Sequence, residues 1–158
     1  ETPLVEVSPT QRAQDRAWSY QASKHYLVQC SAQRSSDLAT LEERSGKLRK
    51  AFAKAEREIG AGPYFRGAVL GNVDIAWLPL LHRASIIENR TGYDFLKGFP
   101  GVKSWQSALL ESEILADSVS ADFEDRFADF YLADDTYLGN LQATRRYEAQ
   151  CSRGGACC

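Results

Sequence analysis

The stretch that decides the fold is residues 67–87, GAVLGNVDIAWLPLLHRASII. From Asn72 onward, nearly every position around a helix of about 3.6 residues per turn is apolar, so almost no polar face remains. A helix that is apolar on all sides belongs in the middle of a fold. We therefore predict a buried central helix from about Asn72 to Ile87, with a kink at Pro79.

The residues just before this helix predict how it begins. With Gly71 at the N-cap, Asp74 falls at the third helical position, where its carboxylate can accept hydrogen bonds from free backbone N–H groups. Leu70 and Ile75 occupy the two positions of a hydrophobic staple. We expect the cap to contribute about 1 kcal/mol or more, because the donors that it satisfies are buried. The alternative role for Asp74 is a catalytic acid, but a carboxylate at this position is more often a cap.

Four further amphipathic segments accompany the central helix. They are predicted at about residues 10–32, 38–59 and 118–132, with one more that begins at Pro100. Strand signals are almost absent, and the sequence after Leu132 is polar, so we expect it to be loosely held. The sequence thus predicts an all-α fold, a bundle of about five or six helices around one buried central helix.

All four segments carry apolar residues that we expect to face inward. In the first they are Ala13, Ala17, Tyr20 and Leu27, with Trp18, Ala22 and Tyr26 beside them. In the second, which has the clearest pattern, they are Leu38, Leu41, Leu48, Phe52, Ala55 and Ile59. In the segment that begins at Pro100 they are Val102, Trp105 and Leu109. In the last they are Val119, Phe123, Phe127 and Phe130.

Composition and charge limit the functions to consider. The 158 residues include 19 basic and 21 acidic side chains, for a net charge of −2. This near balance gives no strong attraction to nucleic acid, so no nucleic-acid partner is expected. No apolar run is long enough for a membrane span, and no secretory leader opens the chain, so we expect a protein that is not secreted. The chain begins with Glu1 and contains no Met, so we expect a processed, truncated or incomplete product.

Three of the four cysteines, Cys151, Cys157 and Cys158, lie in the last eight residues. Zinc needs about four ligands at organised spacing, and no His lies near these cysteines, so no metal site is expected. The four cysteines do not resemble a disulfide framework. We therefore expect thiols in a reducing compartment, either the cytoplasm or an organellar stroma or matrix.

The central motif, with its flanking segments, resembles the all-helical C-terminal domain of glutathione transferases, in particular the omega-like and bacterial branches. Residues 64–67, 70–75 and 79–83 are similar to the core signature of that domain. Residues 99–105 resemble the helix that follows it, and residues 12–18 resemble the first helix after the interdomain linker. The family usually has Ser or Thr at the cap, where this chain has Gly71.

The resemblance divides the chain into three parts. Residues 1–9 resemble the interdomain linker, residues 10–140 resemble the helical domain, and residues 141–158 form a polar, cysteine-containing tail. In the family, a thioredoxin-like N-terminal domain holds glutathione and supplies the Cys, Ser or Tyr that activates its thiol. We do not find that domain in these 158 residues. The resemblance therefore implies a chain that forms the wall for the hydrophobic co-substrate and part of the dimer surface. It would be inactive alone, with no catalytic residue, and would take glutathione only when joined to a thioredoxin-like domain.

By the same resemblance, the first helix faces the thioredoxin-like domain. Tyr20, Lys24 and Tyr26 lie there at positions compatible with the pocket wall, and ordinary packing or solvent exposure is the alternative for each. We expect Cys30 to be a core residue and His25 to lie on an exposed face. Since neither His25 nor His82 has a nucleophile and an acid nearby in the sequence, no catalytic triad is expected.

Three functions remain open at this point. The first is the C-terminal part of a glutathione transferase. The second is a non-catalytic assembly module, since transferase-like helical domains also hold protein complexes together. The third is a carrier of hydrophobic ligands. The partners expected for them are a thioredoxin-like domain, a homodimer mate or a larger protein assembly, because an exposed apolar face needs cover.

Overall fold

The computed structural model describes residues 8–154, which form seven α-helices. These helices are α1 (Pro9–Gln33), α2 (Leu38–Glu58), α3 (Asn72–Thr91), α4 (Pro100–Leu110), α5 (Glu113–Ser118), α6 (Phe123–Tyr131) and α7 (Tyr137–Gly154). The only strand-like pairing between residues 8 and 154 is an isolated antiparallel bridge between Tyr64 and Gly67. The predicted all-α class is confirmed, with one or two helices more than expected. Most of the linker-like segment, together with Cys157 and Cys158, lies outside the described residues.

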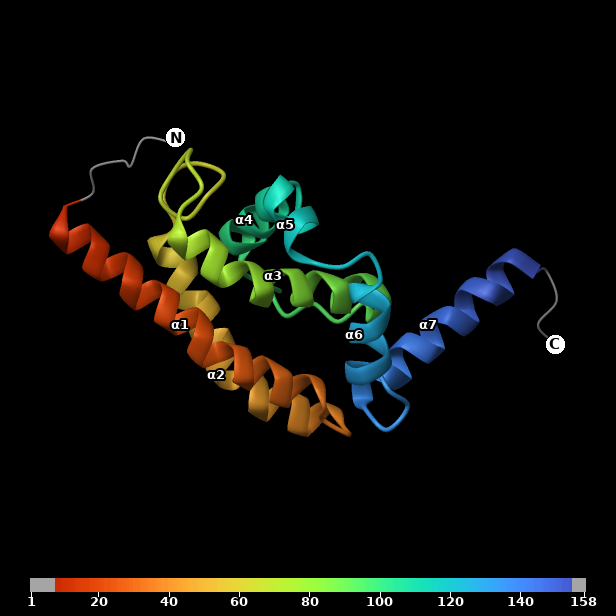
Figure 1. Ribbon diagram of the computed structural model, residues 1–158. Coiled ribbons are helices and arrows are strands. Elements are labelled where there is room, and N and C mark those ends of the chain that lie inside the picture. Colours follow the sequence, from red (N-terminus) through yellow and green to blue (C-terminus); the bar gives the residue numbers. More distant parts are fainter. Residues whose placement is uncertain (1–7, 155–158) are drawn as a thin grey trace.

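The helices surround α3 (Figure 1). The long helices α1 and α2 lie side by side, α3 packs against α1, and α4 and α5 lie along the other side of α3 (Figure 1). The side chains of Trp77, Leu81 and Ile87 on α3 have no exposed surface, which confirms the predicted central helix. The helix continues through Pro79 and ends at Thr91, and the φ of +79° at the following Gly92 is a left-handed conformation that glycine adopts readily.

Burial of α3 is not complete on every side. Ile75 is 47% exposed and Pro79 is also exposed, so one edge of the helix faces solvent. The prediction of a helix buried all round is therefore wrong along this edge. A purely apolar sequence cannot distinguish a side covered by other helices from a side left open.

The carboxylate of Asp74 joins three separate segments at the beginning of α3. Its Oδ2 accepts a hydrogen bond from the Gly71 N–H at 2.8 Å. Its Oδ1 accepts two, from the Phe65 N–H at 2.8 Å and from Trp105 Nε1 at 2.6 Å. Asp74 is only 1% exposed, and its bonds from Phe65 and Trp105 are buried, so these two donors would otherwise be left without water to replace the bond. The carboxylate thus fixes the preceding loop, the helix N-terminus and α4 against one another.

Aromatic side chains pack around this carboxylate. The ring of Phe65 lies between Trp18 and Trp105, with centroid distances of 4.9 and 5.2 Å. Trp77 packs 5.6 Å from Trp105, and its Nε1 donates to the Trp18 carbonyl at 3.0 Å. Tilted aromatic pairs at such distances are favourable beyond their buried area. The cluster therefore holds α1, α3 and α4 together at one end of the bundle.

The inward face of α1 differs from the predicted one. Tyr20 and Leu27 are 68% and 72% exposed, whereas His25 and Gln29 are buried. Gln29 Nε2 donates to the Leu80 carbonyl at 2.9 Å. This hydrogen bond compensates for burial of the side-chain NH₂ group of Gln29. The prediction failed because polar residues occupy the buried face, next to the small residue Ala22, and hydrophobic periodicity does not detect them.

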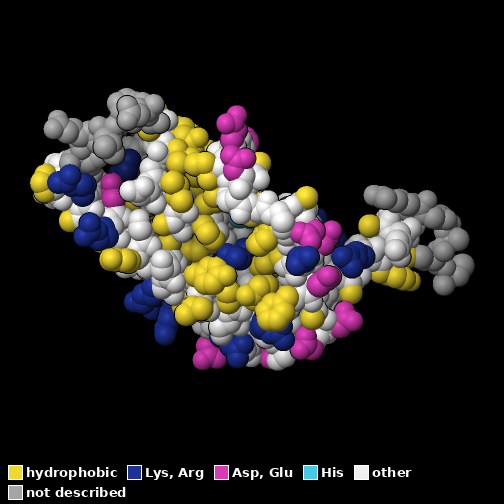
Figure 2. All heavy atoms as spheres, viewed as in Figure 1, with side chains coloured by type: hydrophobic (Ala, Val, Ile, Leu, Met, Phe, Trp, Pro, Cys, Tyr) yellow, Lys and Arg dark blue, Asp and Glu magenta, His cyan; other side chains and the backbone are white. Residues whose placement is uncertain are grey.

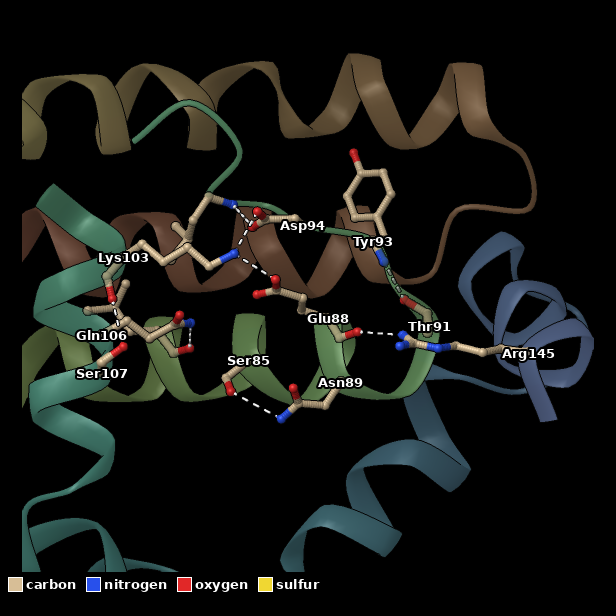
Figure 3. Close-up of polar contacts among 12 residues, drawn as sticks. Ser85, Glu88, Asn89, Thr91, Tyr93, Asp94, Lys103, Gln106, Ser107 and Arg145 are labelled. Atoms are coloured by element: carbon tan, nitrogen blue, oxygen red, sulfur yellow. Dashed lines mark hydrogen bonds and ion pairs between the residues drawn. The ribbon is translucent and has the colours of Figure 1, made fainter. Parts of the chain in front are cut away.

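Polar contacts fasten α4 and α7 to the C-terminal half of α3 (Figure 3). Lys103 on α4 lies between the carboxylates of Glu88 and Asp94, at 2.6 and 2.8 Å. From α7, Arg145 Nη1 donates to the Glu88 carbonyl oxygen at 3.1 Å. The inward positions predicted for α4, including Val102, are all buried.

The end of the chain departs from the prediction of a loosely held segment after Leu132. Tyr137–Gly154 form α7, and its Leu138 is fully buried against the core, with Gln142 also buried. Cys151 on α7 is disulfide-bonded, whereas Cys30 is a free thiol. The expectation of thiols throughout is therefore wrong for Cys151.

The helix predicted at 118–132 is shorter in the structure: it forms α6, and residues 119–122 lie outside any helix, after the end of α5 at Ser118. Phe127 is buried as predicted, whereas Phe130 is 56% exposed and Phe123 is half-buried. The break lies between Ser118 and Phe123, where the chain turns.

No helix within residues 8–154 combines the length and the apolar character needed to cross a bilayer.

Replacing Asp74 tests the junction that it makes. Asp74→Asn keeps the shape but places an NH₂ donor against backbone or indole N–H donors. We expect the free energy of unfolding to fall by about 2–4 kcal/mol, since the lost hydrogen bonds are buried and charge-assisted. Urea denaturation followed by circular dichroism measures the change. The exposed Asp117→Asn on α5 is the matched control and should change stability by no more than about 0.5 kcal/mol. Equal effects of the two substitutions would contradict this role.

Candidate functional site

The side chain of Arg83 on α3 lies between two aromatic rings from different helices. Its guanidinium carbon is 4.5 Å from the ring centre of Tyr26 on α1 and 5.7 Å from that of Phe123 on α6. Cations over aromatic faces at these distances are attracted by the ring quadrupole. This arrangement brings together α1, α3 and α6 at the open edge of α3.

On one side of Arg83 is an apolar hollow of about 570 Å³ between α3 and α5. Most of its lining is aliphatic or aromatic, with His82 and Arg83 as its titratable side chains. The apolar lining residues are Ile75, Leu78, Pro79, Ile114, Leu115, Val119 and Phe123. Such a hollow favours a hydrophobic occupant.

On the other side is a hollow of about 410 Å³ between α1 and α3, lined in part by Ala22, Tyr26 and Ala76. Both hollows include Pro79 and Arg83 in their walls. We call the two together the Arg83 groove. Figure 2 shows hydrophobic side chains gathered across the middle of the molecule, over α3 and α6.

A third hollow, of about 740 Å³, shares His82 and Phe123 with the groove. Its other walls carry several acidic side chains and one basic side chain. The acidic residues are Glu111, Glu113, Glu124 and Asp125, and the basic residue is Arg90. The region beyond Phe123 therefore has a negative character that the Arg83 groove lacks.

The titratable groups beside Arg83 are held in their neutral forms. Burial lowers the pKa of His82 from its ordinary 6.5, the Arg83 charge adds to this, and Glu124 opposes it. His82 is therefore neutral at neutral pH. Burial, followed by the contact with Cys30, raises the pKa of Tyr131 to about 12. Tyr131 Oη donates a hydrogen bond to Cys30 Sγ at 3.2 Å.

The residues predicted for the pocket wall are only partly brought together. Tyr26 lines the Arg83 groove and contacts Arg83. Tyr20 and Lys24 are exposed and line neither of the two hollows that form the groove. Tyr20 and Lys24 therefore stay predictions as residues of the pocket wall.

The cap residues have two different roles. Gly71 and Asp74 form the hydrogen bond described above, and Leu70 is half-buried against the core. Ile75 is instead an exposed residue in the wall of the Arg83 groove.

Arg83 and Phe123 were not identified as site residues from the sequence. The spacing of Ile75, Pro79 and Arg83, one helical turn apart, was the available signal for an open edge of the central helix. Phe123 could not be placed, because it lies on another helix that reaches Arg83 only in the folded chain.

The residues of the Arg83 groove are suited to binding a ligand. Within residues 8–154 there is no group of three or more His, Cys, Asp or Glu side chains that could hold a metal ion. The pKa of Tyr131 is raised, so its hydroxyl is harder to ionise than that of an ordinary tyrosine. The groove supplies apolar walls and one cation.

Comparisons with known proteins agree with this fold. No family model matches the chain. The crystal structure of glutathione transferase Omega 3C from Trametes versicolor is similar, with a TM-score of 0.64 and 26% sequence identity. The match covers 75% of this chain, and over that part the chain and the Omega 3C structure share a helical fold. The predicted fold class, a bundle like the glutathione transferase C-terminal domain, is thereby confirmed. The match covers 54% of the Omega 3C chain, so this chain spans about half the length of that enzyme.

The unusual state of Tyr131 can be measured directly. Difference titration of tyrosinate absorbance between the unmodified chain and Tyr131→Phe should show a midpoint at about 12, because burial opposes ionisation. Cys30→Ala should lower this midpoint, since the contact with Cys30 also raises the pKa. A midpoint near about 10, the value for tyrosine in water, would be inconsistent with the described packing.

Proposed function

We propose that this chain is the helical lobe of a glutathione transferase-like protein, in which the Arg83 groove forms the wall of the pocket for a hydrophobic co-substrate. The groove is the observation that carries the proposal, because its apolar lining lies along the open edge of α3. The similarity to glutathione transferase Omega 3C over about half of that enzyme supports it.

In this proposal the chain binds and positions but does not catalyse alone. Transfer of glutathione requires a thiolate that attacks an electrophile or a disulfide. A thioredoxin-like domain would bring glutathione and the group that activates its thiol. That domain would lie against the open edge of α3 and the neighbouring face of α1, and would close the Arg83 groove from outside. The co-substrate would pack on Ile75, Pro79 and Phe123, its reactive atom directed towards the bound thiol.

A second candidate is a non-catalytic assembly subunit. The residues of α1 at positions 13, 17, 20 and 27 are spaced by three, four or seven and are all exposed. Tyr20 and Leu27 contribute the largest apolar surfaces in this row. Spacing of this kind is typical of a helix that packs against another helix. A homodimer mate or a larger assembly would cover this row.

Binding of a hydrophobic probe tests the groove. The neutral fluorophore N-phenyl-1-naphthylamine should bind the chain, and Ile75→Glu should weaken this binding at least about tenfold, because the ligand would bury an unpaired charge. Val69→Glu is the matched control, since Val69 is 70% exposed and lines neither hollow of the groove. The affinity of the Val69→Glu variant for the probe should stay within about twofold of that of the unmodified chain. Equal binding by both variants would exclude the groove as the site.

Retention on a glutathione resin tests the claim about catalysis. The chain alone should pass through the resin, because the glutathione site is assigned to the other domain. Retention that free glutathione reverses would overturn this assignment. A hydrophobic probe bound to the same sample provides the control that the chain is folded.

A further inference from the structure

Arg83 has no acidic partner within residues 8–154. Four other arginines in this range form ion pairs, namely Arg34, Arg66, Arg90 and Arg126. Arg83 is half-buried between Tyr26 and Phe123, where its charge is partly removed from water. A half-buried cation without a counter-ion is costly, and an anionic ligand would offset that cost.

The guanidinium also has unused hydrogen-bond donors. Its Nε is buried and has no partner in the described part of the chain. Its hydrogen bond to the Pro79 carbonyl uses only Nη1, at a long 3.4 Å. A guanidinium carries five N–H donors in a planar fork, so both Nη2 donors and the second Nη1 donor remain for a planar or tetrahedral anion.

The surroundings determine the rest of such a ligand. The walls on both sides of Arg83 are aromatic or aliphatic, so the body of the ligand would be hydrophobic. Beyond Phe123, Glu124 and the other acidic residues of the third hollow would repel a second negative charge. His82, the other basic side chain in the apolar hollow, is neutral and would not compete for the anion.

We propose that Arg83 binds the anionic group of an aromatic ligand in the Arg83 groove, so that this site selects singly charged aromatic carboxylates or sulfonates over their neutral counterparts. This inference rests on the proposed function, because the ligand is the co-substrate of that pocket. Tyr26 and Phe123 position the guanidinium and contact the ligand ring. Arg83 therefore determines specificity.

Two probes that differ by one charged group test the inference. 1-Anilinonaphthalene-8-sulfonate and N-phenyl-1-naphthylamine share the same ring system, and only the first carries a sulfonate. Arg83→Gln should weaken binding of the sulfonate at least about tenfold, as expected for a charge-assisted hydrogen bond, and that of the amine by less than about threefold. Arg49→Gln is the matched control, because Arg49 also stacks on a ring, that of Phe99, but lies outside the groove. It should leave both affinities unchanged.

The outcomes separate this inference from the proposed function. If Arg83→Gln leaves sulfonate binding unchanged, or weakens both probes equally, the anion site is wrong while the apolar groove stands. If the unmodified chain binds the amine but not the sulfonate, the inference alone fails. If it binds neither probe, the proposed function fails as well.

A test without substitution covers the case in which Arg83→Gln does not fold. Naphthalene-1-sulfonate and naphthalene-1-sulfonamide would compete for N-phenyl-1-naphthylamine bound to the unmodified chain. The sulfonate should compete at least about tenfold better than the neutral sulfonamide. Equal competition would overturn the inference.

Discussion

The arrangement of the helices depends on the hydrogen bonds to one buried carboxylate, that of Asp74, which accepts three of them. Its donors come from the loop before α3, from the N-cap residue Gly71 and from α4. A buried carboxylate is costly unless its hydrogen bonds are complete, and here each bond also fixes one segment in place. The aromatic side chains of Phe65 and Trp105 then pack around a junction that is already positioned.

The position of α3 explains why a groove exists. Fixing the N-terminus of α3 against α4 buries Trp77 on one side and leaves Ile75 and Pro79 on the opposite edge. Arg83 continues that edge and is held between rings from α1 and α6. The groove therefore follows from the packing of the central helix. An apolar surface of this kind needs a ligand or another domain to cover it.

Much of the fold could be predicted, because α3 has few polar residues and Asp74 stands at the position of a capping carboxylate. The site could be predicted only in part. Tyr26 was found through resemblance, whereas Arg83 depends on contacts between segments far apart in the sequence. The face of α1 was assigned wrongly because buried Gln29 satisfies one amide group through a carbonyl of α3, a compensation that periodicity does not reveal. The docking of α7 was missed because Leu138 is its one fully buried apolar side chain among the described residues, while buried Gln142 and the Arg145 contact to α3 are polar.

Native-state hydrogen exchange of individual amides tests the central role of Asp74 most directly. The Phe65 and Gly71 N–H groups, although outside any helix interior, donate to this carboxylate and should exchange only when the whole domain unfolds. The amide of Val69, in the same loop and largely exposed, should exchange far faster. Exchange of all three amides at similar rates would mean that the loop opens independently of the core and would contradict the account.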